Sequence, residues 1–320
     1  MGQKMALSSY KKGLKRLIQM LTPVADHYGK PKLFFWLDAL WANIRYGVTP
    51  NQYIGFRFCE KSALERSEFY THRQHKRFEA ALNDPKYYDA FWDKEKFNAV
   101  FHEFIHRDWL YCADASEEEI RQFLSRHAKV MVKPTSASSG KGVHAYKGET
   151  AEELKRQKFL LEEFVIQHPK MMELNPSCVN TVRIYTILDH QKVPHILSAS
   201  LRVGGANSEV DNFHAGGVAY PLEPAHGVVM SAGRSMLGED CLYHPGTGAK
   251  LIGFEVPKWP DFVQFVFRAT QVLPTARMIA WDVAVLENGF EMIEGNYNGD
   301  PGLMQSPSGK GKKREILKYM

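Results

Sequence analysis

The 320-residue sequence predicts a mixed α/β (α+β) protein in which a mainly helical lobe precedes a body of strands and helices. Two observations predict this fold class. Up to about Phe104, apolar residues recur mostly at helical spacing. After Ser116, the pattern changes to short apolar runs separated by glycines, which is typical of strands. We therefore expect a helical lobe over residues 1–110 and an α/β body over residues 111–320.

The helical lobe is predicted from two apolar series and one charged segment. The first series is Leu14, Leu17, Ile18 and Leu21, and the second is Leu33, Leu37, Leu40, Trp41 and Ile44. A turn signal at residues 47–50 ends the second series. The segment 62–82 is rich in Arg, His and Glu, which predicts one long exposed helix.

The body is predicted from apolar runs that are short enough to be strands. Ser116 is a good N-cap for a helix that begins with three glutamates, and residues 258–272 predict another helix. The candidate strands are Val130–Lys133, Phe159–Phe164, Thr181–Leu188, His195–Val203, Ala280–Leu286 and Phe290–Ile293. This succession predicts a mixed α/β body.

Composition excludes several classes of protein. A hydrophobic fraction of 44% and a charged fraction of 24% are those of a folded globular protein. The net charge of +5 is spread along the chain, and the basic run at residues 310–314 suggests a solvated tail, so we expect no nucleic-acid partner. The four cysteines form no CxxC pair, and no apolar stretch is long enough to span a membrane. These features predict a cytoplasmic protein without a membrane span.

The first stretch that predicts chemistry is the segment from Val130 to Val143. It contains a strand that ends near Lys133, then a loop of small residues with Gly140 and Gly142. Such a loop can lay backbone N–H groups over phosphates, and Lys133 and Lys141 would neutralise phosphate oxygens. The spacing is not that of a Walker A loop, and a plain flexible hairpin is an alternative of equal weight.

The second stretch is the apolar strand that begins at Phe159 and ends in two carboxylates, Glu162 and Glu163. A strand followed by an extended segment can offer backbone N–H and C=O groups to an adenine edge. Carboxylates at a strand end are more often solvated, so this stretch alone is a weak signal.

The third stretch is the segment from Trp281 to Asn296, which contains the favoured hairpin turn Asn288-Gly289. Glu294 and Asn296 are two residues apart, so their side chains leave the same face of the strand. The hairpin brings Asp282 opposite the end that contains Glu294. Three oxygen ligands then converge, which suits Mg²⁺, a cation that bridges nucleotide phosphates. The alternative is a surface hairpin with a polar face.

Taken in order, the three stretches resemble the ATP-grasp superfamily. More narrowly, the chain resembles the sugar-transfer-associated ATP-grasp family, from about Tyr46 to Gln305. The segments that carry the resemblance are 46–50 (YGVTP), 93–97 (DKEKF), 132–134 (VKP), 163–168 (EFVIQH), 175–177 (NPS), 179–183 (VNTVR), 211–217 (DNFHAGG) and 294–296 (EGN). The resemblance implies two α+β subdomains that clasp ATP, one over residues 111–168 with the glycine-rich loop and hinge, the other over residues 169–320 with the metal site.

The resemblance also implies roles for individual residues. The residues implied to bind ATP are Lys94, Lys133, Ser139, Gly140, Lys141, Gly142, Glu162, Glu163, Phe164, Val165 and His168, of which 162–165 form the adenine hinge. Asp282, Glu294 and Asn296 would bind Mg²⁺, or Mn²⁺ in its place. Arg183, Arg202, Lys141 and His214 are the implied catalytic residues. Structural ion pairing is the alternative for the two arginines, and a hydrogen-bonded structural role is the alternative for His214.

The implied reaction is an ATP-dependent ligation. The γ-phosphoryl group would pass to a carboxylate, and an amine or another nucleophile would then displace phosphate from the acyl phosphate. Both substrates are expected to be small molecules, with sugar-linked ones suggested by the family's association with polysaccharide synthesis. The oligomeric state is left open.

Three other interpretations compete with the ligase. A kinase that phosphorylates a sugar or polyol would use the same phosphate and metal residues. A nucleotide-binding module without catalysis is disfavoured because the three expected metal ligands are present. The third is a zinc peptidase, because His102, Glu103 and His106 form an HExxH motif, but no third ligand follows it at a suitable place. On a helical wheel over residues 97–105 the apolar side chains gather on one face, and the two histidines project away from it.

Overall fold

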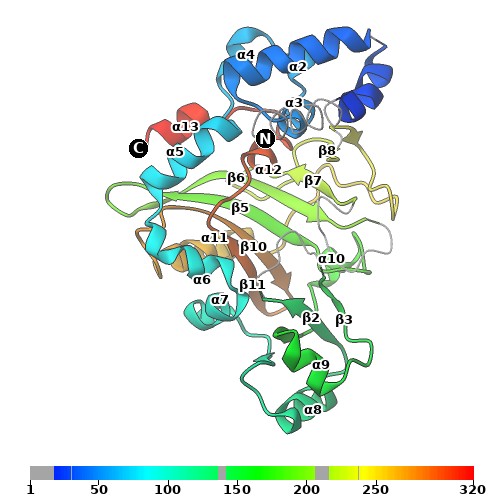
Figure 1. Ribbon diagram of the computed structural model, residues 1–320, viewed down its shortest axis with the longest axis vertical. Coiled ribbons are helices and arrows are strands. Elements are labelled where there is room, and N and C mark those ends of the chain that lie inside the picture. The colour runs from blue at the N-terminus through cyan, green and yellow to red at the C-terminus, as the bar shows by residue number, and fades with distance from the viewer. Residues whose placement is uncertain (1–17, 30, 136–141, 206–215, 237) are drawn as a thin grey trace, which may run out of the picture.

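The computed structural model describes residues 18–29, 31–135, 142–205, 216–236 and 238–320. It contains two antiparallel sheets and a helical lobe at one end (Figure 1). The predicted mixed α/β class with a helical N-terminal region is confirmed. None of the helices in the described ranges is both long and apolar enough to cross a membrane.

The larger sheet has seven strands in the order β11-β10-β5-β6-β7-β8-β9. Their bounds are β5 Thr181–Leu188, β6 Pro194–Val203, β7 Val218–Pro221, β8 Gly233–Arg234, β9 Asp240–Cys241, β10 Met278–Leu286 and β11 Gly289–Asn296. Helix α11 (Trp259–Thr270) packs on one face, where Trp281 and Phe262 belong to the main core. Helix α5 (His72–Leu82) packs on the other face, over Tyr185. The predicted strands in this part of the chain are confirmed.

The smaller sheet has four strands in the order β1-β4-β2-β3. Their bounds are β1 Trp109–Tyr111, β2 Val130–Pro134, β3 His144–Ala145 and β4 Phe159–Glu163. Helices α8 (Glu117–Arg126) and α9 (Ala151–Arg156) cover it, and both begin with a capping box, that of α8 formed by Ser116 and Glu119 as expected. The sheet therefore has its own core, centred on Phe123, Val132 and Leu161.

The N-terminal lobe consists of helical residues 18–28 and the elements that follow them. These are α2 Lys32–Tyr46, α3 Pro50–Gly55, η1 Phe58–Glu60 and α4 Ala63–Ser67. They enclose a separate core with Leu21, Phe35 and Phe58. The single long helix expected over residues 62–82 is wrong, because the buried residues Phe69 and Tyr70 separate α4 from α5.

Further short helices connect the lobe to the sheets. They are η2 Pro85–Tyr87, α6 Tyr88–Trp92, α7 Lys94–Val100, η3 His102–Phe104, α10 Pro169–Met172, α12 Pro301–Gln305 and α13 Lys313–Leu317. Phe91 and Phe97, of α6 and α7, pack into the core of the seven-stranded sheet. The division into domains at residue 110 stays a prediction.

The basic segment near the C-terminus is not a solvated tail as expected. Within it, α13 lies against α4, where the backbone N–H of Lys313 donates to the Glu68 carbonyl at 3.1 Å. Ile316 is fully buried beside Tyr70 and anchors the helix. The apolar side of α13 therefore outweighs its charge in deciding where the segment lies.

Candidate active site

The hairpin β10–β11 sets the geometry of the candidate site. Asp282 pairs directly with Glu294, and Ala280 pairs with Asn296, because a bulge between Asp282 and Val283 shifts the register by one residue. The turn itself consists of Glu287 and Asn288 rather than the expected Asn288-Gly289. On the other side of β10, Asp282 pairs with Arg183 of β5. Side chains at directly opposed positions leave the same face of a sheet, so Glu294, Asp282 and Arg183 form a row across three strands.

Two arginines hold the carboxylate of Asp282. Arg183 binds both oxygens, with Nη2 at 2.5 Å from Oδ2 and Nε in contact with Oδ1. Arg202, from β6, places Nη1 at 2.8 Å from Oδ1. All three side chains are buried, and although burial opposes ionisation, the two guanidiniums lower the pKa of Asp282. We call Asp282, Arg183 and Arg202 the Asp282 cluster.

Glu294 lies in a different electrostatic environment from Asp282. Burial raises its pKa, the charge of Asp282 raises it further, and Lys94 opposes both effects. Lys94 itself has a lowered pKa, because burial outweighs the favourable charge of Glu294 and Lys133 adds a like charge. The expected metal residues Asp282 and Glu294 and the expected phosphate residues Lys94 and Lys133 therefore interact within one electrostatic neighbourhood.

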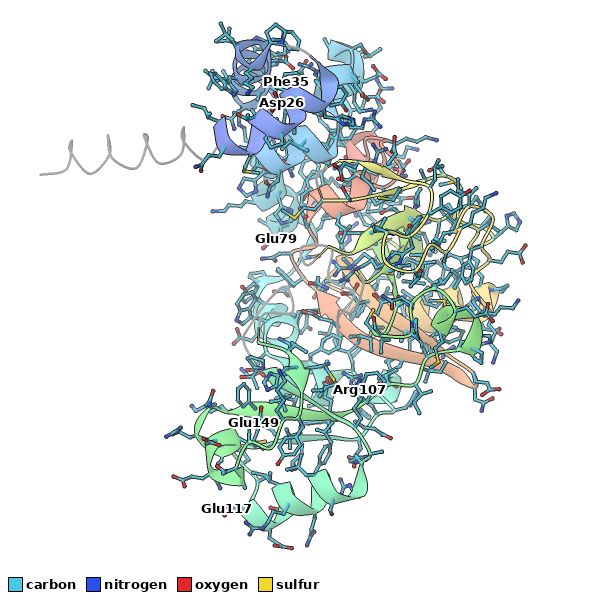
Figure 2. All side chains as sticks on the ribbon, turned by 90° about the vertical axis from the view of Figure 1, so that its right-hand side faces the viewer. Asp26, Phe35, Glu79, Arg107, Glu117 and Glu149 are labelled. Carbon is cyan, nitrogen blue, oxygen red and sulfur yellow. The ribbon has the colours of Figure 1, made fainter. Side chains whose placement is uncertain are left out.

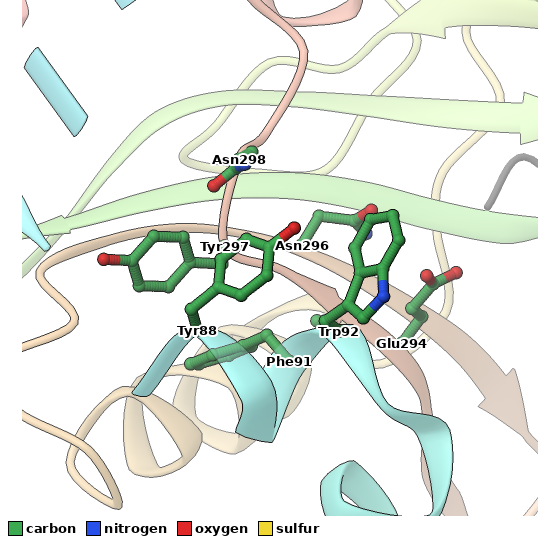
Figure 3. A pocket seen from close by; sticks show the side chains of 8 residues that line it. Tyr88, Phe91, Trp92, Glu294, Asn296, Tyr297 and Asn298 are labelled. Carbon is green, nitrogen blue, oxygen red and sulfur yellow. The ribbon is translucent and has the colours of Figure 1, made fainter. Parts of the chain in front are cut away.

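A pocket of about 160 Å³ opens beside these residues. Glu294, Asn296 and Asn298 lie on the strand side, and Tyr88 and Trp92 on the opposite side (Figure 3). The rings of Tyr88 and Trp92 are stacked with centroids 5.8 Å apart. The buried Nδ2 atom of Asn296 has no hydrogen-bond partner among the described residues. The pocket is smaller than the roughly 300–1,000 Å³ of drug-sized ligand sites, so it fits part of a substrate rather than a nucleotide.

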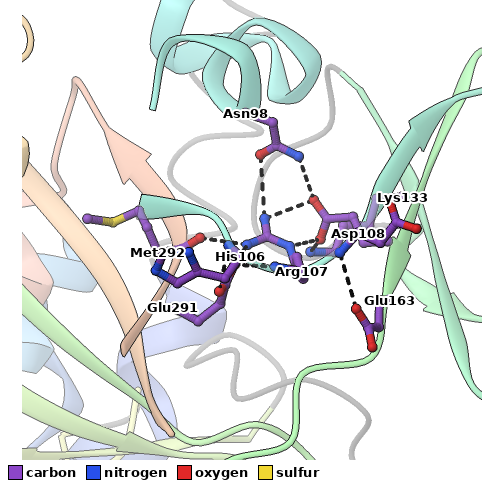
Figure 4. A network of polar contacts seen from close by, with 9 residues as sticks. Asn98, His106, Arg107, Asp108, Lys133, Glu163, Glu291 and Met292 are labelled. Carbon is purple, nitrogen blue, oxygen red and sulfur yellow. Dashed lines mark hydrogen bonds and ion pairs between the residues drawn. The ribbon is translucent and has the colours of Figure 1, made fainter. Parts of the chain in front are cut away.

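A second buried ion cluster joins the two sheets. Arg107 binds Glu162 of β4 at 2.8 Å and Glu291 of β11 at 2.5 Å, and Lys133 of β2 also binds Glu162 (Figure 4). Arg107 lies between the four-stranded sheet and the rest of the body (Figure 2). We call Arg107, Lys133, Glu162 and Glu291 the Arg107 cluster.

The Arg107 cluster limits which atoms of the expected adenine hinge could bind a ligand. Burial alone would raise the pKa of Glu162, but Arg107 and Lys133 hold it well below its ordinary value. The Glu162 carboxylate is therefore ionised and paired with these two cations. The N–H groups of Glu163 and Phe164 donate to the carbonyls of Asp108 and Lys129. The adenine hinge stays a prediction, and these hydrogen bonds show only that the N–H groups of Glu163 and Phe164 already have partners.

Several expected site residues lie away from these clusters or outside the described residues. His168 caps α10, where its Nδ1 accepts from the N–H of Lys170 at 3.1 Å. Gly142 is described, and its φ of 74° suits glycine. Ser139, Gly140, Lys141 and His214 lie outside the described residues.

The HExxH motif does not form a zinc-binding helix. The expected helical wheel over residues 97–105 is wrong, because α7 ends at Val100 and a separate 3₁₀ turn holds His102 and Glu103. His106 follows this turn, and its backbone N–H donates to Glu291 at 2.9 Å. No group of three His, Cys, Asp or Glu side chains within the described ranges could hold a metal. The zinc-peptidase interpretation thus loses its structural basis.

Sequence reasoning missed the residues that link the sheets. Arg107 and Asn98 carried no motif, yet both are buried, and the amide of Asn98 donates to Glu162 at 3.1 Å. An arginine inside an apolar stretch was the available signal, because a buried charge requires a partner. Its partners, Glu162 and Glu291, lie 55 and 184 residues further along the chain.

The fold and the row of charged side chains define an ATP-grasp protein. The chain matches the family described as sugar-transfer-associated ATP-grasp over residues 73–318, which is more than half of its length, and it belongs to that family. The resemblance drawn from the motifs is confirmed. No curated protein matches the chain.

Solved structures match the chain at low similarity. The ATP-grasp ligase PsnB with a minimal precursor matches with 11% identity and a TM-score of 0.47, covering 74% of this chain and 62% of that one. An N5-carboxyaminoimidazole ribonucleotide synthetase from Thermotoga maritima matches with 10% identity and a TM-score of 0.42, covering 74% and 51%. The biotin carboxylase domain of a 2-oxoglutarate carboxylase from Hydrogenobacter thermophilus matches with 12% identity and a TM-score of 0.43, covering 71% and 47%. The chain spans less than two thirds of each of these structures, and likeness at this level concerns the fold alone.

Proposed function

We propose that this protein is an ATP- and Mg²⁺-dependent ligase that activates a carboxylate as an acyl phosphate and joins it to an amine. The observation that carries the proposal is the row Glu294, Asp282 and Arg183, which places carboxylates next to guanidiniums on one face of the sheet. Membership of the sugar-transfer-associated ATP-grasp family supports the same conclusion.

The residues of the hairpin fit a magnesium ion. Glu294 and Asn296 offer oxygen donors beside the pocket, and Asn296 has a buried amide group whose nitrogen lacks a partner among the described residues. Asp282 adds a second carboxylate and a third oxygen-bearing side chain, although its oxygens already accept from two arginines. These donors are of the kind that Mg²⁺ prefers, and a bound Mg²⁺ would neutralise charge on the nucleotide phosphates.

The protein's own cations would hold the nucleotide and the reacting groups. Lys133 and Lys94 lie on the side of the four-stranded sheet, with the N–H of Lys94 hydrogen-bonded to the Thr135 carbonyl just before the glycine-rich loop. We assign these two lysines to ATP phosphates. We assign Arg183 and Arg202 to the transferred phosphoryl group or to the substrate acid, since guanidiniums bind such oxyanions through paired N–H donors.

The proposed ligation has two balanced steps. A carboxylate oxygen attacks the γ-phosphorus, and the bond to the β,γ-bridging oxygen breaks, which releases ADP. An amine nitrogen then attacks the acyl carbon, phosphate leaves with its oxygen, and the amine loses a proton. Arg183 and Arg202 would stabilise charge on the phosphoryl oxygens in both steps. The aromatic pocket beside Glu294 would seat part of the acid or the amine.

The substrates are proposed to be small molecules of sugar-conjugate or polysaccharide synthesis, handled in the cytoplasm. The family's description as sugar-transfer-associated supports this assignment. A kinase acting on a sugar hydroxyl would use the same phosphate and metal residues, so the products have to distinguish the two reactions.

The test is ATP turnover screened against carboxylates and amines, with mass spectrometry of the products. A ligase releases phosphate only when acid and amine are both present, whereas a kinase leaves a stable phosphoester. We expect Glu294→Gln to lose Mg²⁺-dependent turnover by about 10²-fold or more, because it removes a charged metal ligand. Glu287→Gln, at an exposed position within the β10–β11 turn, is the matched control. Full turnover in Glu294→Gln would remove the metal assignment.

A further inference from the structure

The pocket beside Glu294 has one aromatic wall and one polar wall (Figure 3). Tyr88 and Trp92, one turn apart on α6, stack with their ring planes at 16°, and Trp92 is 46% exposed. Glu294, Asn296 and Asn298 line the other wall from alternate positions of the chain. A ligand in this pocket therefore meets flat apolar rings on one side and a series of polar groups on the other.

Packing below the pocket holds the two walls in place. A Cβ atom added to Gly295 would come within 2.7 Å of Phe97 and 2.9 Å of Phe91, so these rings lie directly against the backbone of β11. In the amide orientation that satisfies its hydrogen bonds, Asn298 donates to Glu79 of α5 at 3.1 Å. The pocket is therefore formed before a ligand arrives, which lowers the cost of ordering side chains on binding.

The polar wall offers both a donor and an acceptor to a ligand. The buried Nδ2 atom of Asn296 donates to no described residue, and a ligand oxygen at this point would remove the cost of leaving it unpaired. The metal site assigned to Asn296 uses the oxygen of the amide, so the nitrogen stays available. The carboxylate of Glu294 can accept hydrogen bonds. A ligand that both donates and accepts suits this wall.

The charges around the pocket disfavour a cationic ligand. Burial raises the pKa of Glu294, and three nearby cations, Lys94, Arg183 and Lys133, oppose that rise. An ammonium group would add a further positive charge to this set. A plain aromatic ring would fill the space but would leave Asn296 unpaired. A saturated ring with hydroxyl groups suits both walls, since its C–H face packs on aromatic rings and its hydroxyl groups donate and accept.

We propose that this pocket binds a sugar ring, with its C–H face on Trp92 and Tyr88 and its hydroxyl groups hydrogen-bonded to Asn296 and Asn298. The pocket volume of about 160 Å³ is about half the lower limit for drug-sized ligands, which suits one ring and not a chain of several. This inference rests on the proposed function, because it names the chemical group that one substrate of the same site presents to the pocket.

The test is a ligand-observed NMR titration of the full chain with D-glucose, D-galactose, N-acetyl-D-glucosamine and D-glucuronate, with and without a magnesium-loaded ATP analogue. We expect at least one of these sugars to bind the parent. Trp92→Ala should weaken that binding by about tenfold or more, because it removes half of the aromatic wall. Trp92→Phe should weaken it less, because it keeps a ring. Trp41→Ala is the matched control, since it removes an indole that is 48% exposed on α2, and it should bind as the parent does.

Three outcomes would overturn the inference. The first is that none of the four sugars binds the parent. The second is equal affinity in the parent and in Trp92→Ala. The third is that ethylammonium or benzoate binds the parent more tightly than every sugar and loses this binding in Trp92→Ala, since the pocket would then accept a cation or an aromatic acid. Retained Mg²⁺–ATP binding and an unchanged melting temperature in Trp92→Ala would show that lost sugar binding is not due to unfolding.

The inference and the proposed function fail in different ways. A parent that binds Mg²⁺–ATP but none of the sugars refutes the sugar pocket and leaves the ligase in place. A parent that loses sugar binding in Trp92→Ala, yet joins no acid to any amine in the turnover screen, refutes the ligase and leaves the sugar pocket in place.

Discussion

The two buried ion clusters of this protein differ in how their charges are matched. In the Arg107 cluster, two cations, Arg107 and Lys133, face two carboxylates, Glu162 and Glu291. In the Asp282 cluster, two guanidiniums share a single carboxylate. A carboxylate accepts about four hydrogen bonds, whereas two guanidiniums offer about ten donors. Among the described residues, the second cluster therefore has the higher ratio of cations to carboxylates, which suits an anionic ligand.

This difference separates a structural role from a functional one. The matched cluster ties the four-stranded sheet to β11, and breaking it would leave a buried charge without its partner. The Asp282 cluster lies in the row with Glu294, beside the pocket. We expect substitutions of Arg107 and Glu291 to act mainly on stability and those in the Asp282 cluster mainly on turnover.

The largest expected effect is that of Arg107→Met on stability. The substitution leaves Glu291 buried without its cation and removes one of the two cations of Glu162. We expect the free energy of unfolding to fall by about 3–5 kcal/mol, the cost of breaking a buried ion pair by removing one partner. Denaturant unfolding at neutral pH measures it. A loss below about 1 kcal/mol would contradict the structural role of the cluster.

Acidification provides an independent control on the same cluster. Because Arg107 and Lys133 lower the pKa of Glu162 in the folded state, the contribution of this carboxylate to stability is present above its ordinary pKa of 4.5. That contribution is lost as pH falls towards the folded-state pKa. The Arg107→Met variant should therefore lose less stability than the parent when pH is lowered below about 4.5.

The next effect in size is that of Arg202→Met on turnover. Asp282 keeps both contacts with Arg183, so the free energy of unfolding should fall by no more than about 2 kcal/mol. Turnover should fall by about 10²–10³-fold, the cost of losing a donor that stabilises charge in the transition state. Steady-state kinetics with saturating Mg²⁺–ATP measures this loss.

Arg202→Lys is the control that keeps the positive charge but removes the planar guanidinium group. It should recover part of the turnover, because an ammonium group keeps the charge but cannot donate two parallel N–H bonds. If Arg202→Met keeps full turnover and loses as much stability as Arg107→Met, both clusters have a structural role. The proposed functional role of the Asp282 cluster would then be wrong.

Sequence patterns predicted the parts of the site that depend on neighbours along the chain. The predicted hairpin was expected to bring Asp282 near the end that contains Glu294, and its two strands were confirmed, although a bulge beside Asp282 sets the exact pairing. Alternation within a strand depends only on local geometry, so it can be read without knowledge of the fold.

Features that depend on distant contacts could not be predicted in this way. The partners of Arg107 come from two different sheets, and no local pattern contains them. Helix α2 has an apolar series on each side, so spacing alone could not show that Leu37 and Trp41 face outward while Phe35 enters the core. The HExxH spacing predicted one helix, but the burial of Phe101 and Phe104 under the seven-stranded sheet ends α7 early.

The smallest expected effect is a thermal shift caused by inorganic phosphate without nucleotide or metal. The guanidinium groups of Arg183 and Arg202 should bind this anion, which stabilises the folded state. At ten times its dissociation constant, phosphate would add about 1.4 kcal/mol and raise the melting temperature by about 2–4 °C. Arg202→Met should abolish the shift, whereas Arg156→Met, at an exposed position at the end of α9, should keep it. An equal shift in both variants would show that phosphate binds elsewhere than at these two arginines.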